Sequence, residues 1–337
     1  MKIRIFGESH APEIGVEIEG VPKGTVIDGD ELQAFLDRRA PGNGQGGLST
    51  SRREPDRVEF ESGVERAARE STSSTLLATG EMIRAVIRNT NTRPQDYANV
   101  LTVPRPGHAD YASWLKCGKI PTGGGKWSGR MTAPLCIAGG IALQILRRRG
   151  VTIESTVRRG AEGAALRDGD SVGGIVEVVA TGFPAGHGDV GAEGLESKLA
   201  AAFFGIPAVK GVEFGDGFKL ADMFGSEAND AFEVVTEGRE TGDGRRERVS
   251  LRTNHCGGIL GGVSVGMPIV ARLAFKPTPS IAIEQDSVDL ATMTPAKIKV
   301  EGRHDRCVAF RGAVAAEAAM AVVLADELRV AGCGLRV

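Results

Sequence analysis

The amino-terminal region alternates between strand-like and helix-like hydrophobic patterns. Hydrophobic and polar residues alternate in "KIRIF" and in "GVEIEGVP", and this period of two predicts two β-strands. In "DGDELQAFLDRRAPG", Leu32, Phe35 and Leu36 share one face at helical spacing, aspartates precede them, and a proline and a glycine follow. The pattern predicts a short helix that has Arg38 and Arg39 at its carboxyl end.

Two later segments are hydrophobic almost all round. "TAPLCIAGGIALQILRRRG" and "RGAVAAEAAMAVVLADELRVAG" predict buried helices. Between them, "GGIVEVVATG", "AVKGVEFGDG" and "GGVSVGMPIVARLAFKP" predict antiparallel strands with one solvent-exposed face. We therefore expect an α+β fold in which antiparallel sheets enclose a central helical layer. The chain has no internal repeat and no long Pro/Ser linker, so we expect a single domain over residues 1–337.

The composition is that of an ordinary globular chain. The 337 residues are 41% hydrophobic with a formal net charge of -2, so no basic field favours a nucleic acid. No signal-peptide pattern or apolar run of about 20 residues is present, so we expect neither export nor a membrane span. Five cysteines without a CxxC pair favour a reducing cytoplasm. The 47 glycines, about twice the average share, indicate tight turns or close backbone approach to a ligand.

Four loop segments join a titratable or cationic residue to glycine or proline: "GESH", "PRPGH", "GGGKWSGR" and "GRHD". "GGGKWSGRMT" precedes the first buried helix, where backbone N–H groups and the helix dipole favour a phosphate. It is neither a P-loop nor a dinucleotide turn. Taken alone, it could equally be a glycine-rich turn with a solvated lysine. The loop "GNGQGG" and the basic segment after it predict a mobile, cationic loop.

Arginines recur in these loops. A guanidinium binds a carboxylate or a phosphate through two hydrogen bonds, so several together suit a small substrate with several negative charges. The alternative is an independent surface role for each. The arginines in question are Arg39, Arg52, Arg105, Arg130 and Arg303.

His10 and His108 lie in short loops of small and rigid residues. Histidine changes charge near neutral pH, so both are candidate general acids; the alternative is a turn histidine that caps a backbone group. The histidines are scattered and no HxxxH pair exists, so we expect no metal site.

An ordered series of motifs resembles that of the chorismate synthase family. The series runs "GESHA", "DRRAPG", "SRREPD", "PRPGHADY", "GGGKWSGR", "AVKGVEFGDGF", "NHCGGILGG", "KPTPSI" and "GRHDRC", from about residue 5 to about residue 330. The resemblance implies a β-α-β sandwich subunit, a homotetramer and reduced FMN as cofactor. It also implies a 1,4-anti elimination that converts 5-enolpyruvylshikimate 3-phosphate to chorismate without net redox change, in aromatic amino acid biosynthesis. NADPH would be needed only to reduce the flavin, for which an external flavin reductase is a further expected partner.

The same resemblance implies residue roles. His10 would protonate the departing phosphate, His108 would protonate reduced flavin, and Asp305 would help to remove a proton from flavin N5. The implied substrate-binding residues are Arg39, Arg52, Arg105 and Arg130. The implied flavin-binding residues are Lys126, Trp127, Ser128, Glu227, Ala228, Gly261, Lys276, Pro277, Thr278, Pro279, Ser280 and Arg303.

Some positions depart from the family pattern. Lys126 and Trp127 stand where the family usually has arginine and serine, and Arg306 stands where proline is usual. We expect Arg306 to loosen the loop that contains Asp305. Two rival functions remain open at this point: a divergent homologue that binds flavin or a phosphorylated ligand without elimination, and a nicotinamide-dependent oxidoreductase. The second lacks a Rossmann turn.

Overall fold

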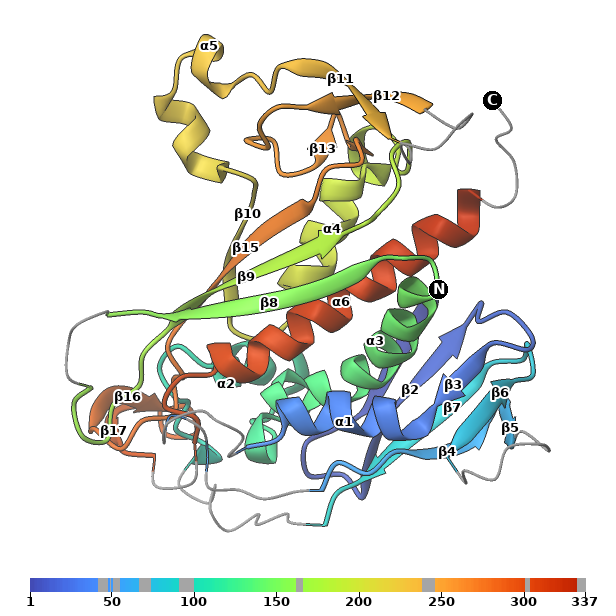
Figure 1. Cartoon of the computed structure of the whole chain (residues 1–337). Coiled ribbons are helices and arrows are strands. Elements are labelled where there is room, and N and C mark those ends of the chain that lie inside the picture. Colours follow the sequence, from blue (N-terminus) through green and yellow to red (C-terminus); the bar gives the residue numbers. More distant parts are fainter. Residues whose placement is uncertain are drawn as a thin grey trace.

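Two apolar helices form the centre of the molecule (Figure 1). The computed structural model describes residues 1–41, 48, 50, 55–66, 74–90, 100–161, 166–237, 246–300 and 304–331. Helix α3 (Thr132–Arg147) packs along helix α6 (Ala309–Ala331). Their small residues allow a close approach, because a Cβ atom added at Gly139 would lie 2.2 Å from the Cβ of Ala318. The prediction of two buried helices is confirmed.

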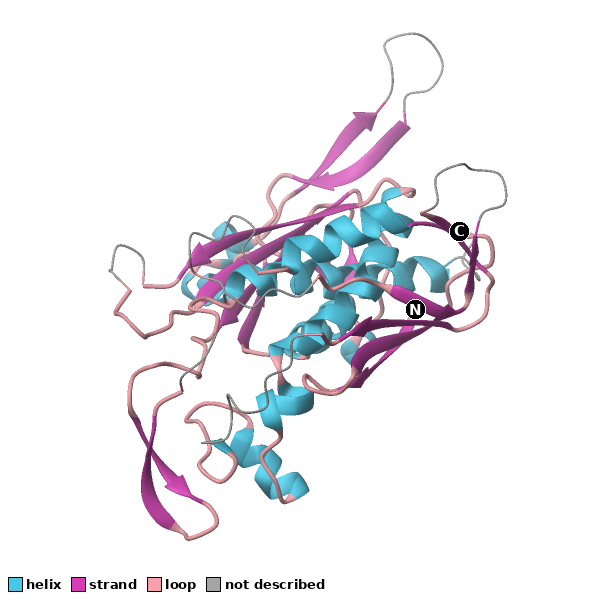
Figure 2. Ribbon diagram, turned by 90° about the horizontal axis from the view of Figure 1, so that it is seen from below, coloured by secondary structure: helices cyan, strands magenta, loops and turns pink. Residues whose placement is uncertain are grey.

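Two antiparallel four-stranded sheets cover this helical layer (Figures 1 and 2). One packs on α3, and the other packs on α6. The first has the strand order β1 (Lys2–Gly7), β2 (Glu13–Glu19), β7 (Ile83–Arg88), β4 (Glu59–Ser62). The second has the order β10 (Val209–Phe214), β15 (Ile269–Phe275), β9 (Gly174–Thr181), β8 (Thr152–Arg159). The predicted α+β fold is confirmed.

Strand β15 shows how the sequence pattern sets the face that is buried. Ile269, Ala271, Leu273 and Phe275 alternate with more polar neighbours and are 0–4% exposed. Their partners in β9 are buried in the same alternation, and both rows belong to one hydrophobic core that also includes α3 and α6. The alternation predicted from the sequence therefore places one face of this sheet on the helical layer.

The predicted amino-terminal helix is α1 (Gly29–Arg39). Its N-cap, Asp28, accepts hydrogen bonds from the backbone N–H groups of Asp30 and Glu31, and its face of Leu32, Phe35 and Leu36 is buried. The helix directs the side chain of Arg39 into the protein, where it is 1% exposed. It therefore supplies a cation to the interior at its carboxyl end.

Shorter elements connect these layers. The remaining helices are α2 (Asp110–Cys117), α4 (Leu195–Phe204) and α5 (Gly225–Ala228), with 3₁₀ turns η2 (Thr122–Trp127), η3 (Gly129–Met131), η4 (Gly191–Glu193) and η5 (Gly217–Asp222). A small sheet has the order β3 (Val26–Asp28), β6 (Thr75–Ala78), β5 (Val64–Arg66). The hairpins are β11 (Phe232–Glu237) with β12 (Arg246–Leu251), β13 (Ile259–Leu260) with β14 (Val263–Ser264), and β16 (Gln285–Asp289) with β17 (Thr294–Ile298). Two of the hairpins project from the body of the molecule (Figure 2).

One segment reaches membrane-spanning length by composition, contrary to the expectation that none would. Residues Gly129–Arg147, which comprise η3 and α3, form 19 residues of high mean hydropathy. In the folded chain 78% of its most apolar window is buried inside the protein. Its hydrophobicity is that of a helix in a protein core.

Candidate active site

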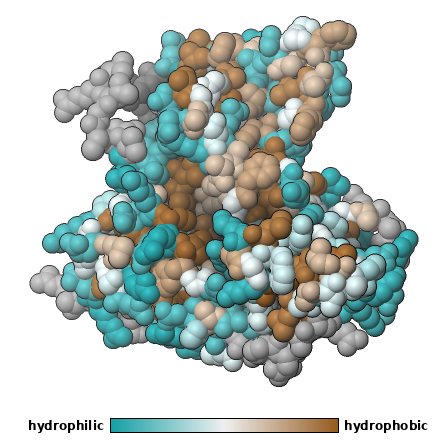
Figure 3. All heavy atoms as spheres, turned by 180° about the vertical axis from the view of Figure 1, so that it is seen from behind, coloured by the Kyte–Doolittle hydropathy of each residue, from teal (hydrophilic) through white to brown (hydrophobic). Residues whose placement is uncertain are grey.

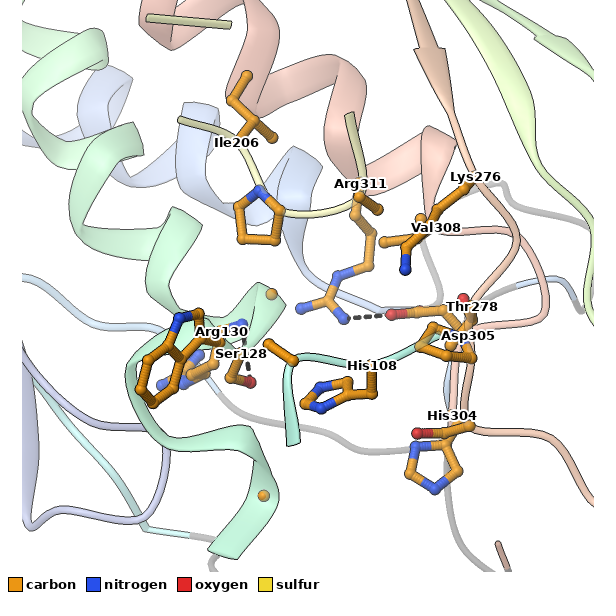
Figure 4. Close-up of a pocket in the computed structure, with 18 of the residues that line it drawn as sticks. His108, Ser128, Arg130, Ile206, Lys276, Thr278, His304, Asp305, Val308 and Arg311 are labelled. Atoms are coloured by element: carbon orange, nitrogen blue, oxygen red, sulfur yellow. Dashed lines mark hydrogen bonds and ion pairs between the residues drawn. The ribbon is translucent and has the colours of Figure 1, made fainter. Parts of the chain in front are cut away.

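A cavity of about 480 Å³ opens where several loops meet below the helical layer (Figure 4). The loops come from parts of the chain that are far apart in sequence. They are the described part of the segment between α1 and β4, the turn between α4 and β10, the segment before α2, the η2–η3 turn, the end of β15, and the residues that lead into α6. Among the predicted site residues, the cavity is lined by Arg105, His108, Lys126, Trp127, Ser128, Arg130, Lys276, Thr278, Pro279, Ser280 and Asp305.

The cavity has one apolar wall and an excess of positive charge. The apolar wall is the turn from Phe204 to Val209, together with Val308. Among the residues that the structure describes, the lining has two carboxylates, Asp56 and Asp305. The same residues include five cationic side chains, those of Arg105, Lys126, Arg130, Lys276 and Arg311. Such a lining suits a ligand that has a flat apolar part and several negative charges.

A turn of three glycines packs against both candidate histidines, of which His108 lines the cavity. Gly123, Gly124 and Gly125 have φ angles of 62°, 82° and 52°, which favour glycine. A Cβ atom at Gly123 would lie 2.1 Å from Cε1 of His10, and one at Gly124 would lie 3.0 Å from Cε1 of His108. The glycine turn, which the sequence predicts to bind a phosphate, therefore also leaves room for two imidazole rings.

His10 lies behind this turn and is not part of the cavity lining. Its Nδ1 lies 3.1 Å from Oγ of Ser9, and that hydroxyl donates to the carbonyl of Gly123 at 3.0 Å. Because the hydroxyl proton is used on the carbonyl, the Ser9 oxygen is left to accept from Nδ1. Ser9 thus orients His10 against the glycine turn.

His108 belongs to a compact network with Arg105 and Asp110. Nδ1 of His108 lies 2.5 Å from Oδ1 of Asp110, whose side chain is fully buried. Arg105 donates from Nε and Nη2 to the same carboxylate at 2.7 and 2.8 Å, and from Nη1 to Oγ of Ser280 at 3.0 Å. The predicted substrate clamp Arg105 is therefore also a structural partner of Asp110.

Burial is the first influence on the pKa of His108, and it lowers it. The hydrogen bond to Asp110 opposes this effect, whereas the positive charges of Arg105 and Lys276 add to it, and the resulting pKa lies below the ordinary value. The imidazole is consequently neutral at neutral pH.

Two further predicted clamps, Arg39 and Arg130, meet on the buried carboxylate of Asp56. Each guanidinium forms an ion pair with one oxygen of Asp56, and all three side chains are at most 5% exposed. Burial alone would raise the pKa of Asp56, but the two guanidiniums outweigh it and hold the pKa below its usual range. Asp56 and Arg130 line the cavity, and Arg39 stands behind them.

Asp305 is held by two donors at the entrance to α6. The backbone N–H of Thr50 donates to Oδ1 at 3.0 Å, and Nη1 of Arg311 lies 2.8 Å from Oδ2 (Figure 4). The expected loosening by Arg306 stays a prediction, and the hydrogen bonds of Arg306 itself count against it. Its backbone N–H, which proline would lack, donates to the carbonyl of Leu48 at 2.8 Å, and its Nη2 donates to the carbonyl of Arg167 at 2.8 Å.

The remaining predicted flavin residues fall into three groups. Nζ of Lys126 lies 5.0 Å from the ring centre of Trp127, so these two neighbours form a cation–π pair at the cavity. Pro277 packs against Gly173, outside the cavity lining. Glu227 and Ala228 on α5, and Gly261 between β13 and β14, lie on the upper part of the molecule in Figure 1, away from this cavity.

Some predicted positions lie outside the described residues. These are Arg52, Arg303 and the loop "GNGQGG".

Sequence reasoning missed Asp56, Asp110, Arg311 and the apolar turn from Phe204 to Val209. Asp110 is part of "PRPGHADY" and Asp56 ends "SRREPD", so a carboxylate beside a candidate histidine or arginine was the available signal. The apolar turn contains no titratable residue and gave no such signal.

The fold and the cavity define a class of protein: an α+β enzyme whose site combines histidines with an excess of cationic side chains. The family model for chorismate synthase matches residues 1–164 and 161–328. The chain belongs to the chorismate synthase family, whose members are carbon–oxygen lyases.

Individual relatives match over almost the whole chain. The chorismate synthase of Lancefieldella parvula is 41% identical over 97% of this chain and 94% of its own length. That of Pyrococcus abyssi is 40% identical, over 97% and 96%. A crystal structure of a chorismate synthase is similar in fold, with a TM-score of 0.67 and 23% identity over 97% of this chain and 91% of that one.

Proposed function

We propose that this enzyme converts 5-enolpyruvylshikimate 3-phosphate to chorismate by 1,4-anti elimination of phosphate, with reduced FMN and without net redox change. The observation that supports this most is that a member of this family has a cationic cavity lined by His108, with His10 packed behind the glycine turn at its edge. The substrate has two carboxylates and a phosphate, and the cavity presents five cationic side chains. Arginine and lysine at such a site bind anions through charge-assisted hydrogen bonds.

The cavity residues fit a flavin. The apolar turn from Phe204 to Val209 offers a surface for a ring system, and the lysines offer partners for a phosphate. Oγ1 of Thr278 is buried and has no hydrogen-bond partner among the described residues, so a bound ligand could satisfy it. Lys126, Trp127, Ser128, Lys276 and Thr278 would hold the group. When bound, reduced FMN would lend electron density to the substrate as the allylic phosphate departs and would then recover it.

The side chains of this protein would bind the substrate and move protons. His10 would give a proton to the departing phosphate, His108 would protonate the reduced cofactor, and Asp305 would accept a proton as a carboxylate kept in place by Arg311. The cationic side chains would hold the substrate's acid groups so that the leaving group and the departing hydrogen are correctly placed.

An anaerobic assay with purified protein, the enolpyruvyl substrate and chemically reduced FMN tests this function. We expect chorismate to form without consumption of NADPH, and His108→Ala to lower the rate by about 100-fold or more. Tight flavin binding without chorismate would contradict the proposal in favour of a non-catalytic homologue. Repeating the assay with oxidised FMN and NADPH shows whether the protein reduces its own flavin or depends on a separate flavin reductase.

We also propose that the enzyme is a homotetramer. Phe218 on η5, Phe224 just before α5 and Phe232 on β11 are 67–81% exposed, and Figure 3 shows hydrophobic residues over the upper part of the molecule. Exposed apolar surface of this kind favours association. In an assembly, α5 and the β13–β14 turn of one copy could reach the cavity of another, which would reconcile the remote positions of Glu227 and Gly261 with a flavin role.

Light scattering on purified protein tests the assembly. Phe224→Glu should lower the mass, whereas Met293→Glu, at an equally exposed position (80%) on the β16–β17 turn, should leave it unchanged. A wild-type mass other than that of four chains would contradict this proposal.

A further inference from the structure

Asp110 is a buried carboxylate for which the proposed reaction has so far given no role. It follows His108 by two residues and begins α2, and its side chain is 0% exposed. Oδ2 accepts from the backbone N–H and from Nε of Arg105, at 3.0 and 2.7 Å. Oδ1 accepts from Nη2 of Arg105 at 2.8 Å and contacts Nδ1 of His108 at 2.5 Å. The carboxylate thus faces four hydrogen-bonding nitrogens.

These contacts determine where the proton of neutral His108 lies. Burial alone would raise the pKa of Asp110, but its bonds to Arg105 and His108 outweigh that effect and keep the pKa far below its usual range. An ionised carboxylate has no hydrogen to donate, so the contact between Oδ1 and Nδ1 requires the proton on Nδ1. Nη2 of Arg105 has two hydrogens, and besides Oδ1 it lies 3.0 Å from Nδ1 and 3.4 Å from Nε2 of His108. Both contacts are longer than the 2.5 Å between Nδ1 and the ionised Oδ1, so the contact with the carboxylate decides where the ring proton lies.

The other ring nitrogen is then an acceptor. Nε2 is on the edge of the imidazole nearest Gly124, since a Cβ atom at that glycine would lie 3.2 Å from Nε2 and 3.0 Å from Cε1. His108 lines the cavity, and Figure 4 shows its ring between Ser128 and Asp305. A proton that moves between His108 and a ligand in the cavity would therefore move at Nε2.

We propose that Asp110 is a positioning residue that fixes the proton of His108 on Nδ1 and so reserves Nε2 for proton exchange with the ligand. This rests on the proposed function, in which His108 protonates the reduced cofactor. Nε2 first takes a proton from solvent and then gives it up, and His108 returns to the neutral form. Asp110 stabilises the cation in between, while Arg105 and Lys276 oppose it.

Replacing Asp110 by asparagine should reverse the tautomer. An amide has one acceptor oxygen, and two donors of Arg105 converge on the Oδ2 position whereas only one reaches Oδ1. The amide oxygen is therefore best placed at Oδ2, which puts the NH₂ group opposite Nδ1 of His108. A donor at that point requires Nδ1 to accept, so the proton moves to Nε2.

Long-range ¹H–¹⁵N NMR of histidine-labelled protein reads the tautomer without any turnover. The chain has five histidines, and the spectrum of a His108→Gln variant identifies the His108 signals. We expect the proton on Nδ1 in the wild type at about pH 8 and on Nε2 in Asp110→Asn. His255, whose Nδ1 lies 2.7 Å from Asp216, is an internal reference that should not change. A wild-type His108 with its proton on Nε2, or an unchanged tautomer in Asp110→Asn, overturns the proposal even if the variant is inactive.

Kinetics separate positioning from general damage. Asp110→Asn should lower kcat by about 100-fold or more, with KM for the enolpyruvyl substrate little changed. Glu317→Gln is the control, because Glu317 is also a buried carboxylate held by an arginine, Arg38 at 2.7 Å, but it lies outside this cavity. Equal losses in both variants would overturn the proposal. Wild-type protein without chorismate formation would instead contradict the proposed function, and the NMR result would still decide the role of Asp110.

Discussion

Two buried aspartates flank the same cavity and differ in the partners that compensate their charge. Asp56 is bound by two guanidiniums, those of Arg39 and Arg130. Asp110 is bound by one guanidinium and one imidazole. Both side chains are 0% exposed, so burial is equally complete. The difference lies in whether a partner can lose its proton near neutral pH.

The Asp56 centre has a fixed charge. Arginine stays protonated at every accessible pH, so Arg39, Asp56 and Arg130 together keep one net positive charge beside the cavity. The Asp110 centre changes its charge with the protonation of His108. The first arrangement suits the binding of an anion, and the second suits the transfer of a proton.

The largest effect on stability is expected when the Asp56 centre loses its carboxylate. Asp56→Asn removes the carboxylate that both buried guanidiniums bind and should lower the free energy of unfolding by about 3–5 kcal/mol. Asparagine tolerates the left-handed φ of 41° at this position, so the loss reports the charge. Urea unfolding measures it. Asp286→Asn, at an aspartate whose side chain is 88% exposed, should change stability by less than about 0.5 kcal/mol. A loss below about 1 kcal/mol at Asp56 would show that the two arginines do not depend on it.

A smaller effect is expected from a substitution in the glycine turn that packs against His108. Gly124→Ala places a methyl group 3.0 Å from Cε1 of His108 and should lower kcat by about 10- to 100-fold, because the ring must shift. The left-handed backbone adds a stability cost of about 1–2 kcal/mol. Steady-state kinetics and urea unfolding measure the two effects.

Gly118→Ala is the matched control for this variant. Gly118 ends α2 with a φ of 69°, and a Cβ atom there would have no atom within 4 Å. Gly118→Ala should therefore lose a similar amount of stability through its left-handed backbone and keep its activity. Equal kcat values in the two variants would mean that Gly124 does not determine the placement of His108.

The sequence predicts those parts of the molecule that short-range pattern determines. The alternation in β15 and the apolar faces of α3 and α6 are enough to predict the sheets and the helical layer. Strand β16, "QDSVD", has a single hydrophobic residue and forms through its pairing with β17, so its own pattern does not predict it.

Local sequence pattern marks candidate site loops but does not show which side chains meet in them. Loops with histidine, arginine or lysine beside glycine mark chemistry, and most of the marked residues line one cavity. The partnership of Arg39 with Arg130 through Asp56 arises only when distant segments meet in the fold. The contacts of Gly123 with His10 are of the same kind, since no local pattern shows which ring a glycine must accommodate.

The smallest expected effect is a difference in how the two centres respond to pH. His108 has a lowered pKa in the folded protein, so below about pH 6.5 the unfolded chain takes up a proton that the folded chain resists. As the pH is lowered from that point, the free energy of unfolding should decrease until folded His108 is also protonated. The pKa values of Asp56 and Asp110 are lowered as well, so their contribution is complete above about pH 3.8 and is lost only below it.

Urea unfolding of the wild type and of His108→Gln, from about pH 8 to about pH 5, isolates this response. At the upper end both side chains are neutral, so the difference there is the baseline for the substitution. As the pH falls, the wild type should lose more stability than the variant, because only the wild type has an imidazole that folding keeps unprotonated. Parallel curves would mean that burial, Arg105 and Lys276 together do not outweigh Asp110. A relative gain in wild-type stability would mean that Asp110 prevails and that resting His108 is already a cation.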